Sequence, residues 1–150
     1  MTLEPVDAVH TDPVWRERAN FIIAAALPGT DRAEQLWARR IDDRLYEVCC
    51  IPFFLYDVAL GDVVEASASH ALARVVEPSG RFVFRVWLGG TAHPRQDVAD
   101  ELTELGALFE WSSTDLLAID AADAWHSRVI AEVLAGHERM GHFLYETGRT

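Results

Sequence analysis

The stretch 45–64, which reads LYEVCCIPFFLYDVALGDVV, constrains the fold of this chain more than any other. Its two ends are rich in residues that favour strands, and the middle is aromatic with few turn-forming residues. Pro52 ends the first strand, because proline cannot donate a hydrogen bond to a β-ladder. We therefore expect a strand over 46–51, a buried crossing over 52–60, and another strand starting at Gly61-Asp62.

Extended patterns lie on both sides of this stretch. The apolar run 21–27 is interpreted as a strand that ends at Pro28-Gly29. Two runs around the acidic turn 42–44 indicate a hairpin, and another pair of strands follows the crossing. The first half is thus predicted to be an antiparallel meander of about five strands, over 21–27, 35–41, 45–51, 62–68 and 71–77.

The pattern changes after residue 80. Alternating apolar residues over 81–88 predict a strand, and a helix is expected from Pro94 to Gly106. Two strands and a second helix, capped by Asp123, follow before a last short strand over 143–146. The order β-α-β-β-α-β is typical of the ferredoxin-like unit.

The predicted fold class is therefore α+β, an N-terminal antiparallel β meander packed on a C-terminal ferredoxin-like βαββαβ unit. We expect a flexible N-terminal segment over 1–14, a β sub-module over 15–80 and the ferredoxin-like sub-module over 81–150. No linker separates the two sub-modules, so they are expected to form one compact unit.

Charge excludes several classes of function. The formal net charge of −11 disfavours nucleic-acid binding and favours a basic protein partner. All 13 basic residues are arginine, which excludes a lysine Schiff base, pyridoxal phosphate attachment and a P-loop lysine. Gly-x-Gly-x-x-Gly and Gly-x-Ser-x-Gly motifs are absent, so we expect no cofactor-binding residues.

A cytoplasmic location is expected. No apolar run approaches the length of a membrane span, and residues 1–13 lack the basic region of a secretory signal. The two cysteines, Cys49 and Cys50, are neighbours on a predicted strand and point to opposite faces, so a mutual disulfide is geometrically poor.

The sequence resembles a bacterial family known as domain of unknown function 4265. The matching residues are Leu36-Trp37-Ala38, Leu45-Tyr46-Glu47, Ile51-Pro52-Phe53-Phe54, Val58 to Val64, Gly106, Glu110-Trp111, Leu117 to Asp120 and Tyr145-Glu146. The resemblance covers most of the chain from about Phe21 onward. It implies a small bacterial cytoplasmic domain and no catalytic residues.

Three kinds of residue are candidates for chemistry, each with a structural alternative. His137 and His142 are five positions apart, about 140° around a helix, so we predict no metal site. Cys49 or Cys50 could act as a nucleophile with His70 or His93 as the base, although buried cysteine is usually a small apolar residue. The carboxylates in or beside apolar strands could be acids or bases, or turns and caps: Glu47, Asp57, Asp62, Glu110 and Asp120.

A cleft between the sub-modules is the predicted ligand site. We expect its binding residues to be Tyr46, Tyr56, Asp62, Trp87 and Trp111, because aromatic clefts between packed units commonly bind small molecules. The alternative is that the aromatic residues are core, with Trp87 packed against the first sub-module and Arg85 paired with a carboxylate.

Two functions remain open. The first is a binding protein that engages a basic protein partner or a small ligand through its acidic surface or this cleft. The second is a small cofactor-independent enzyme that uses a carboxylate, histidine or cysteine in the cleft.

Overall fold

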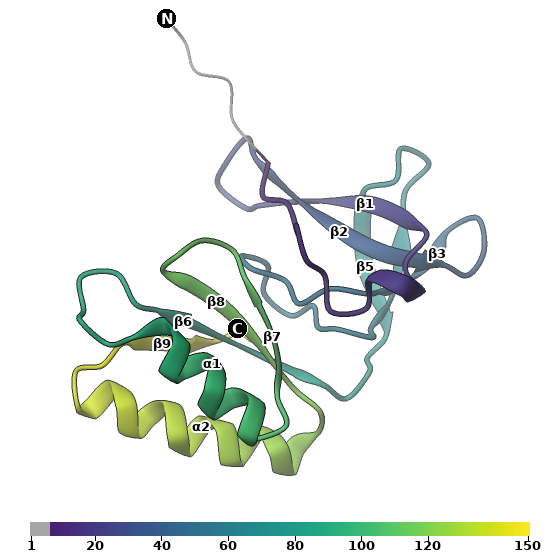
Figure 1. Ribbon diagram of the computed structural model, residues 1–150. Coiled ribbons are helices and arrows are strands. Elements are labelled where there is room, and N and C mark those ends of the chain that lie inside the picture. Colours follow the sequence, from purple (N-terminus) through teal and green to yellow (C-terminus); the bar gives the residue numbers. More distant parts are fainter. Residues whose placement is uncertain (1–6) are drawn as a thin grey trace, which may run out of the picture.

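The computed structural model describes residues 7–150 and contains two antiparallel sheets and two α-helices (Figure 1). The fold is mixed α+β, as predicted. In chain order the elements are a 3₁₀ turn η1 (Arg16–Arg18), β1 (Phe21–Ala26), β2 (Ala33–Arg40), β3 (Leu45–Val48), β4 (Val63–Ala66), β5 (Leu72–Glu77), β6 (Phe82–Trp87), α1 (Arg95–Glu104), β7 (Leu108–Trp111), β8 (Leu116–Ala121), α2 (Ala124–Arg139) and β9 (Leu144–Thr147).

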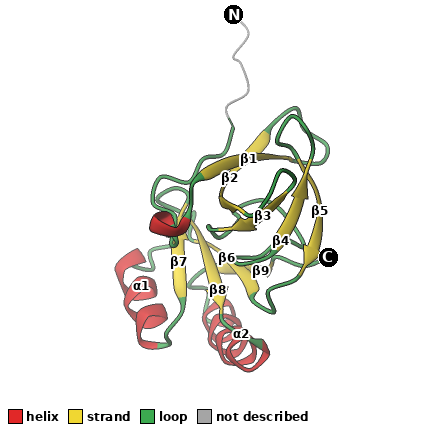
Figure 2. Cartoon of the chain, turned by 90° about the vertical axis from the view of Figure 1, so that its right-hand side faces the viewer, coloured by secondary structure: helices red, strands yellow, loops and turns green. Residues whose placement is uncertain are grey.

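The first sheet has five strands in the order β1-β2-β3-β4-β5, and each strand pairs with the next one in the sequence. It curls until its two edges meet, since Ala24 in β1 forms a parallel bridge with Ala71 beside β5 (Figure 2). Alternation dictates which side chains face inward, as in β2, where Leu36 and Ala38 are fully buried. The curled sheet therefore encloses its own apolar core.

The second sheet has the order β7-β8-β6-β9, and both helices pack on one of its faces (Figure 1). Phe84 and Val86 of β6 point toward the helices and meet Leu102 of α1 and Leu134 of α2. The carboxylate of Asp123 accepts a hydrogen bond from the backbone N–H of His126 at 2.8 Å, which confirms the predicted cap of α2.

The opposite face of the second sheet meets the first module. In the structure the crossing spans residues 49–62, from the end of β3 to the start of β4. Val83 and Ala118 from this face pack against Ile51, Phe53 and Leu60 of the crossing. The crossing is buried at most positions, as its composition predicts, while Phe54, Tyr56 and Asp57 reach the surface. This crossing is what joins the two sheets.

Trp87 does not pack against the first module as expected. Its side chain is 46 % exposed, because the crossing covers the sheet around Val83 and Ala118 and leaves the Trp87 end of β6 open. The expected pairing of Arg85 with a carboxylate is confirmed, since its Nη1 lies 3.3 Å from Glu146 Oε1.

Within residues 7–150, neither helix is both long and apolar enough to cross a membrane.

Candidate functional site

The five residues predicted to bind a ligand do not line one cavity. Tyr46 is fully buried inside the first sheet, with its hydroxyl 3.5 Å from His70 Nδ1. Trp111 lies on the helical side of the second sheet, where the guanidinium of Arg95 stacks 4.0 Å from its ring. These two aromatic residues therefore contribute to packing in different parts of the fold.

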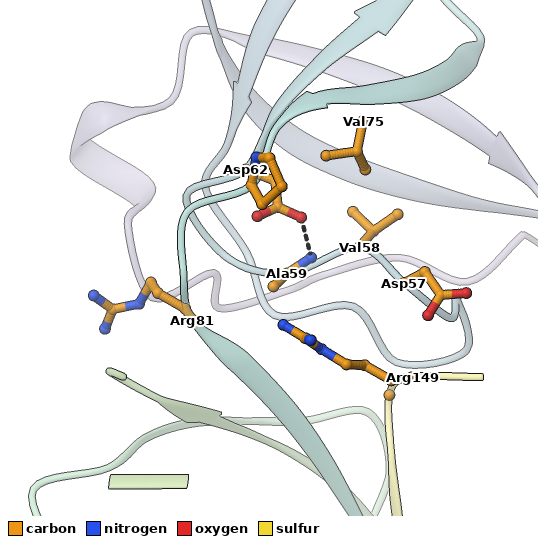
Figure 3. A pocket seen from close by; sticks show the side chains of 9 residues that line it. Asp57, Val58, Ala59, Asp62, Val75, Arg81 and Arg149 are labelled. Carbon is orange, nitrogen blue, oxygen red and sulfur yellow. Dashed lines mark hydrogen bonds between the residues drawn. The ribbon is translucent and has the colours of Figure 1, made fainter. Parts of the chain in front are cut away.

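Asp62 holds a turn together. One carboxylate oxygen accepts the backbone N–H of Ala59 at 2.9 Å, and the other accepts that of Ser79 at 2.8 Å. Asp62 is only 4 % exposed, yet it borders a hollow of about 340 Å³ between the two modules (Figure 3). Figure 3 also shows Arg149 reaching across this hollow below Ala59. Because both oxygens of Asp62 already accept hydrogen bonds, its role there is structural.

Tyr56 contacts Arg85 and Glu146, which border the exposed Trp87, but Tyr56 itself lines a different surface hollow, with Leu27, Arg32 and Phe54 among its neighbours. The Tyr56 hydroxyl donates to Glu146 Oε2 at 2.7 Å, and the Arg85 guanidinium lies 5.0 Å from the centre of the Tyr56 ring. The hydrogen bond to Glu146 raises the pKa of the Tyr56 phenol, which keeps its proton in place. Trp87 follows Arg85 on the same face of β6, two residues along the strand.

A surface pocket of about 290 Å³ opens beside this group. We call it the Trp87 pocket; it is lined by Arg85, Trp87, Leu116, Leu144, Tyr145 and Glu146. Trp87 and Leu144 are 46 % and 63 % exposed, so the wall is apolar and accessible. Paired positions on adjacent strands explain the arrangement, because Trp87 lies opposite Leu116 on one side and Leu144 on the other.

Arg85 forms the polar floor of the Trp87 pocket. Its side chain is 3 % exposed, and it donates to Glu146 and to the carbonyl oxygens of Pro52 and Leu55 in the crossing. Its Nε atom is buried without a hydrogen-bond partner among the described residues. Buried donors are nearly always satisfied, so this N–H is an exception in the structure.

The backbone beneath Trp87 leaves no room for a side chain. A Cβ atom on Gly89 would lie 2.3 Å from the Trp87 ring. Glycine at this position therefore lets the indole lie flat over the turn and sets the shape of the pocket wall.

Neither Cys49 nor Cys50 has the lowered pKa of a nucleophilic thiol. Burial raises the pKa of Cys49 to about 11, with the Glu47 carboxylate acting in the same direction. Burial also raises the pKa of Cys50, which outweighs the opposing effect of His10. Both groups remain thiols at neutral pH, and the thiolate is the nucleophilic form.

The candidate carboxylates have structural partners. Glu47 pairs with Arg18 and Arg39, and Asp120 binds Arg81 through both oxygens at 2.9 and 2.6 Å. Asp57 accepts hydrogen bonds from the backbone and side chain of Thr150.

Glu110 belongs to a buried cluster that reasoning from the sequence missed. His10 Nδ1 lies 2.7 Å from Glu110, and His10 Nε2 lies 2.7 Å from Glu34. The carboxylates also accept backbone N–H groups of the crossing, Ile51 for Glu110 and Phe53 for Glu34. We call these three side chains the His10 clasp, because they join the N-terminal segment, the first sheet and the second sheet.

The His10 imidazole is protonated at neutral pH. Burial lowers its pKa, but the contacts with Cys50, Glu110 and Glu34 outweigh burial and raise it to about 12. The three side chains of the clasp are closed to solvent and bind one another and the backbone, so the clasp is a structural device. It also shows that part of the segment expected to be flexible, 1–14, is packed at His10, while residues 1–6 lie outside the described part. An isolated histidine in a polar segment carries no sequence signal for such burial.

Comparisons with known proteins identify relatives without a described activity. The sequence model of a family described as "Domain of unknown function (DUF4265)" matches residues 34–145. Among solved structures, a hypothetical protein from Neisseria gonorrhoeae has a TM-score of 0.72 at 15 % sequence identity, over 85 % of this chain and 93 % of that one. The latter likeness shows a shared fold. No curated protein matches the chain.

Proposed function

The chain belongs to the DUF4265 family, and from that premise we propose that it is a binding protein that takes a small amphipathic ligand in the Trp87 pocket. The ligand has an apolar group for the walls and a carbonyl or similar oxygen for Arg85. The observation that carries the proposal is the exposed apolar wall of Trp87 and Leu144 beside the Arg85–Glu146 ion pair. Apolar pockets with a few converging polar groups are the usual form of small-molecule sites.

The apolar walls supply affinity. An exposed fraction of 46 % corresponds to roughly 115 Å² of a large aromatic side chain. A ligand that covers half of this area gains about 1.5 kcal/mol, or roughly tenfold in affinity. Leu144 and Leu116 add to the same surface.

Arg85 and Glu146 supply selectivity. The Arg85 guanidinium is already neutralised by Glu146, so a fully charged anion gains little there and meets the Glu146 carboxylate. A neutral acceptor, such as an amide carbonyl, meets no such repulsion. A ligand amide or ester therefore fits the pocket better than a carboxylate.

Three related compounds test this class of ligand. Phenylacetamide, phenylacetate and 2-phenylethylamine share one apolar group and differ in the polar one, and each can be titrated by saturation-transfer NMR. We expect millimolar binding of the amide, as is usual for compounds of about ten heavy atoms, weaker binding of the acid, and the weakest binding of the amine. No saturation transfer from the amide up to about 10 mM would refute the proposal.

The variant Trp87→Ala tests whether the compounds bind in the Trp87 pocket, and Trp125→Ala is its control. Trp125 is 72 % exposed at the start of α2 and does not line the pocket. We expect Trp87→Ala to weaken phenylacetamide binding about tenfold and Trp125→Ala to leave it unchanged. Equal effects of both variants would indicate nonspecific contact with exposed indoles.

The finer features of the fold and location are part of the proposal. The strand order β7-β8-β6-β9 supports a ferredoxin-like assignment of the second half, and the sequential order of β1 to β5 supports a meander for the first. We further propose that this is a bacterial cytoplasmic protein; its two free buried thiols suit a reducing compartment. The enzyme hypothesis receives less support, because the candidate carboxylates and thiols are occupied or inactive.

A further inference from the structure

Three of the six histidines of the chain gather at one end of the helical layer. His93 lies in the loop before α1, His137 in the last turn of α2, and His142 just after that helix. One ring nitrogen from each lies within 4.8 Å of the other two. All three side chains are partly exposed, so an ion from solvent can reach them.

The end of α2 explains why His137 and His142 meet although they are five residues apart. The backbone N–H of His142 donates to the carbonyl of His137 at 3.0 Å, and that of Gly141 donates to Glu138 at 3.0 Å. With Gly141 at φ +74°, these bonds form a Schellman motif, which folds the chain back over the last helical turn. The 140° separation expected for a continuous helix does not apply, and the two Nδ1 atoms are 2.8 Å apart.

Glu101 on α1 fixes the orientation of the central histidine. Its Oε1 lies 2.5 Å from His137 Nε2, which makes Nε2 the protonated nitrogen and leaves Nδ1 with a free lone pair. A carboxylate on the far nitrogen of a histidine is the usual outer contact of metal-binding imidazoles. His93 completes the group, with its ring stacked 4.4 Å from that of His142.

We propose that His93, His137 and His142 bind one divalent transition-metal ion, with Glu101 as the positioning residue for His137. Three imidazole nitrogens suit zinc, nickel, cobalt or copper rather than calcium or magnesium, which require oxygen ligands. Three protein ligands leave further coordination positions for water. Small rotations of the rings bring their nitrogens to bonding distance, since all three side chains are partly exposed.

In the metal-free protein the facing Nδ1 atoms at 2.8 Å share one proton, which belongs to His142 because His137 carries its own proton on Nε2. When the ion takes both Nδ1 lone pairs, the His142 proton moves to Nε2 of the same ring, so each imidazole keeps one proton. The site is independent of the Trp87 pocket, so its test does not depend on the proposed ligand.

Isothermal titration of the untagged, metal-free protein with Zn²⁺ tests the proposal. We expect one Zn²⁺ site per chain with a dissociation constant below about 100 μM. Co²⁺ gives a second readout, since visible absorption bands report nitrogen coordination. No Zn²⁺ binding below about 100 μM would overturn the proposal.

Variants assign the ligands. His93→Ala lies in a loop and leaves both helices intact, so loss of at least tenfold in Zn²⁺ affinity with an unchanged unfolding midpoint is the expected result. His70→Asn is the control, because His70 is exposed in the other module and asparagine tolerates its φ of +63°.

Glu101→Gln tests the positioning role. It is expected to weaken Zn²⁺ binding by about 10–100-fold, whereas Glu104→Gln on the same helix leaves binding unchanged. If His93→Ala binds Zn²⁺ with the same affinity as the His70→Asn control and the unsubstituted protein, the three histidines are not the ligands.

Discussion

Replacement of His10 by glutamine tests the buried clasp that joins the two sheets. Glutamine can donate to one carboxylate but carries no charge, so Glu34 and Glu110 remain buried with little compensation; their side chains are 0 % and 2 % exposed. Breaking a buried charged network by removing one member costs about 3–5 kcal/mol. We expect His10→Gln to lose that much free energy of unfolding at pH 7, measured by urea denaturation.

The pH dependence of stability gives a sharper test. The pKa of His10 is about 12 in the folded protein and 6.5 for an ordinary histidine. Its stabilisation is therefore complete below pH 6.5 and is lost progressively as pH rises toward 12, because the unfolded chain gives up the proton first. Between pH 7.0 and 8.5 this contribution falls by about 2 kcal/mol.

The difference in free energy of unfolding between the unsubstituted protein and His10→Gln should shrink by that amount over the same interval. Titrating groups that do not contact His10 are common to both proteins and cancel. Asp43→Ala, at a fully exposed side chain, serves as the control and should follow the unsubstituted protein between pH 7.0 and 8.5. A difference that stays constant from pH 7.0 to 8.5 would show that His10 is not held as an imidazolium, and the charged clasp would be rejected.

Two further predictions concern turns, and both are measured by urea denaturation. Asp62→Ala leaves the buried N–H of Ala59 and the partly buried N–H of Ser79 without their acceptors and should cost about 2–3 kcal/mol. Asp43→Ala, at a fully exposed side chain, should change stability by less than about 0.5 kcal/mol, and equal effects of the two variants would contradict the capping role. Gly141→Ala should lower the free energy of unfolding by about 1–2 kcal/mol because Gly141 has a positive φ. Gly136→Ala, inside α2 with space for a methyl group, should raise it by about 0.5–1 kcal/mol. If both variants changed the free energy of unfolding in the same direction, the conformational argument would be contradicted.

The strands and helices were accessible from the sequence because their signals are local. Alternation across 81–88, the proline and glycine punctuation, and the Asp123 cap each act within a few residues of the element that they define. The burial of the 52–60 crossing was also accessible, because a long apolar connection with few turn residues has to be covered.

The sites depend on residues that the chain brings together from far apart. His10 and Glu110 are 100 positions apart, and no periodicity links them. The exposure of Trp87 depends on how far the crossing extends over the sheet, which composition does not encode. The approach of His142 to His137 depends on the turn at Gly141, which the angle around a continuous helix does not describe.

The span of the His10 clasp has a consequence for synthesis of the protein on the ribosome. The N-terminal end emerges first, so His10 and Glu34 are available long before Glu110 has been translated. Until β7 is translated, His10 has Glu34 but not Glu110 as a partner. The Ile51 N–H in the crossing likewise lacks the Glu110 carboxylate that accepts its hydrogen bond. Because domains begin to fold during synthesis, the nascent first half should remain accessible to proteases until Glu110 arrives. Completion of the second sheet then becomes the step that supplies Glu110 to His10 and covers the crossing.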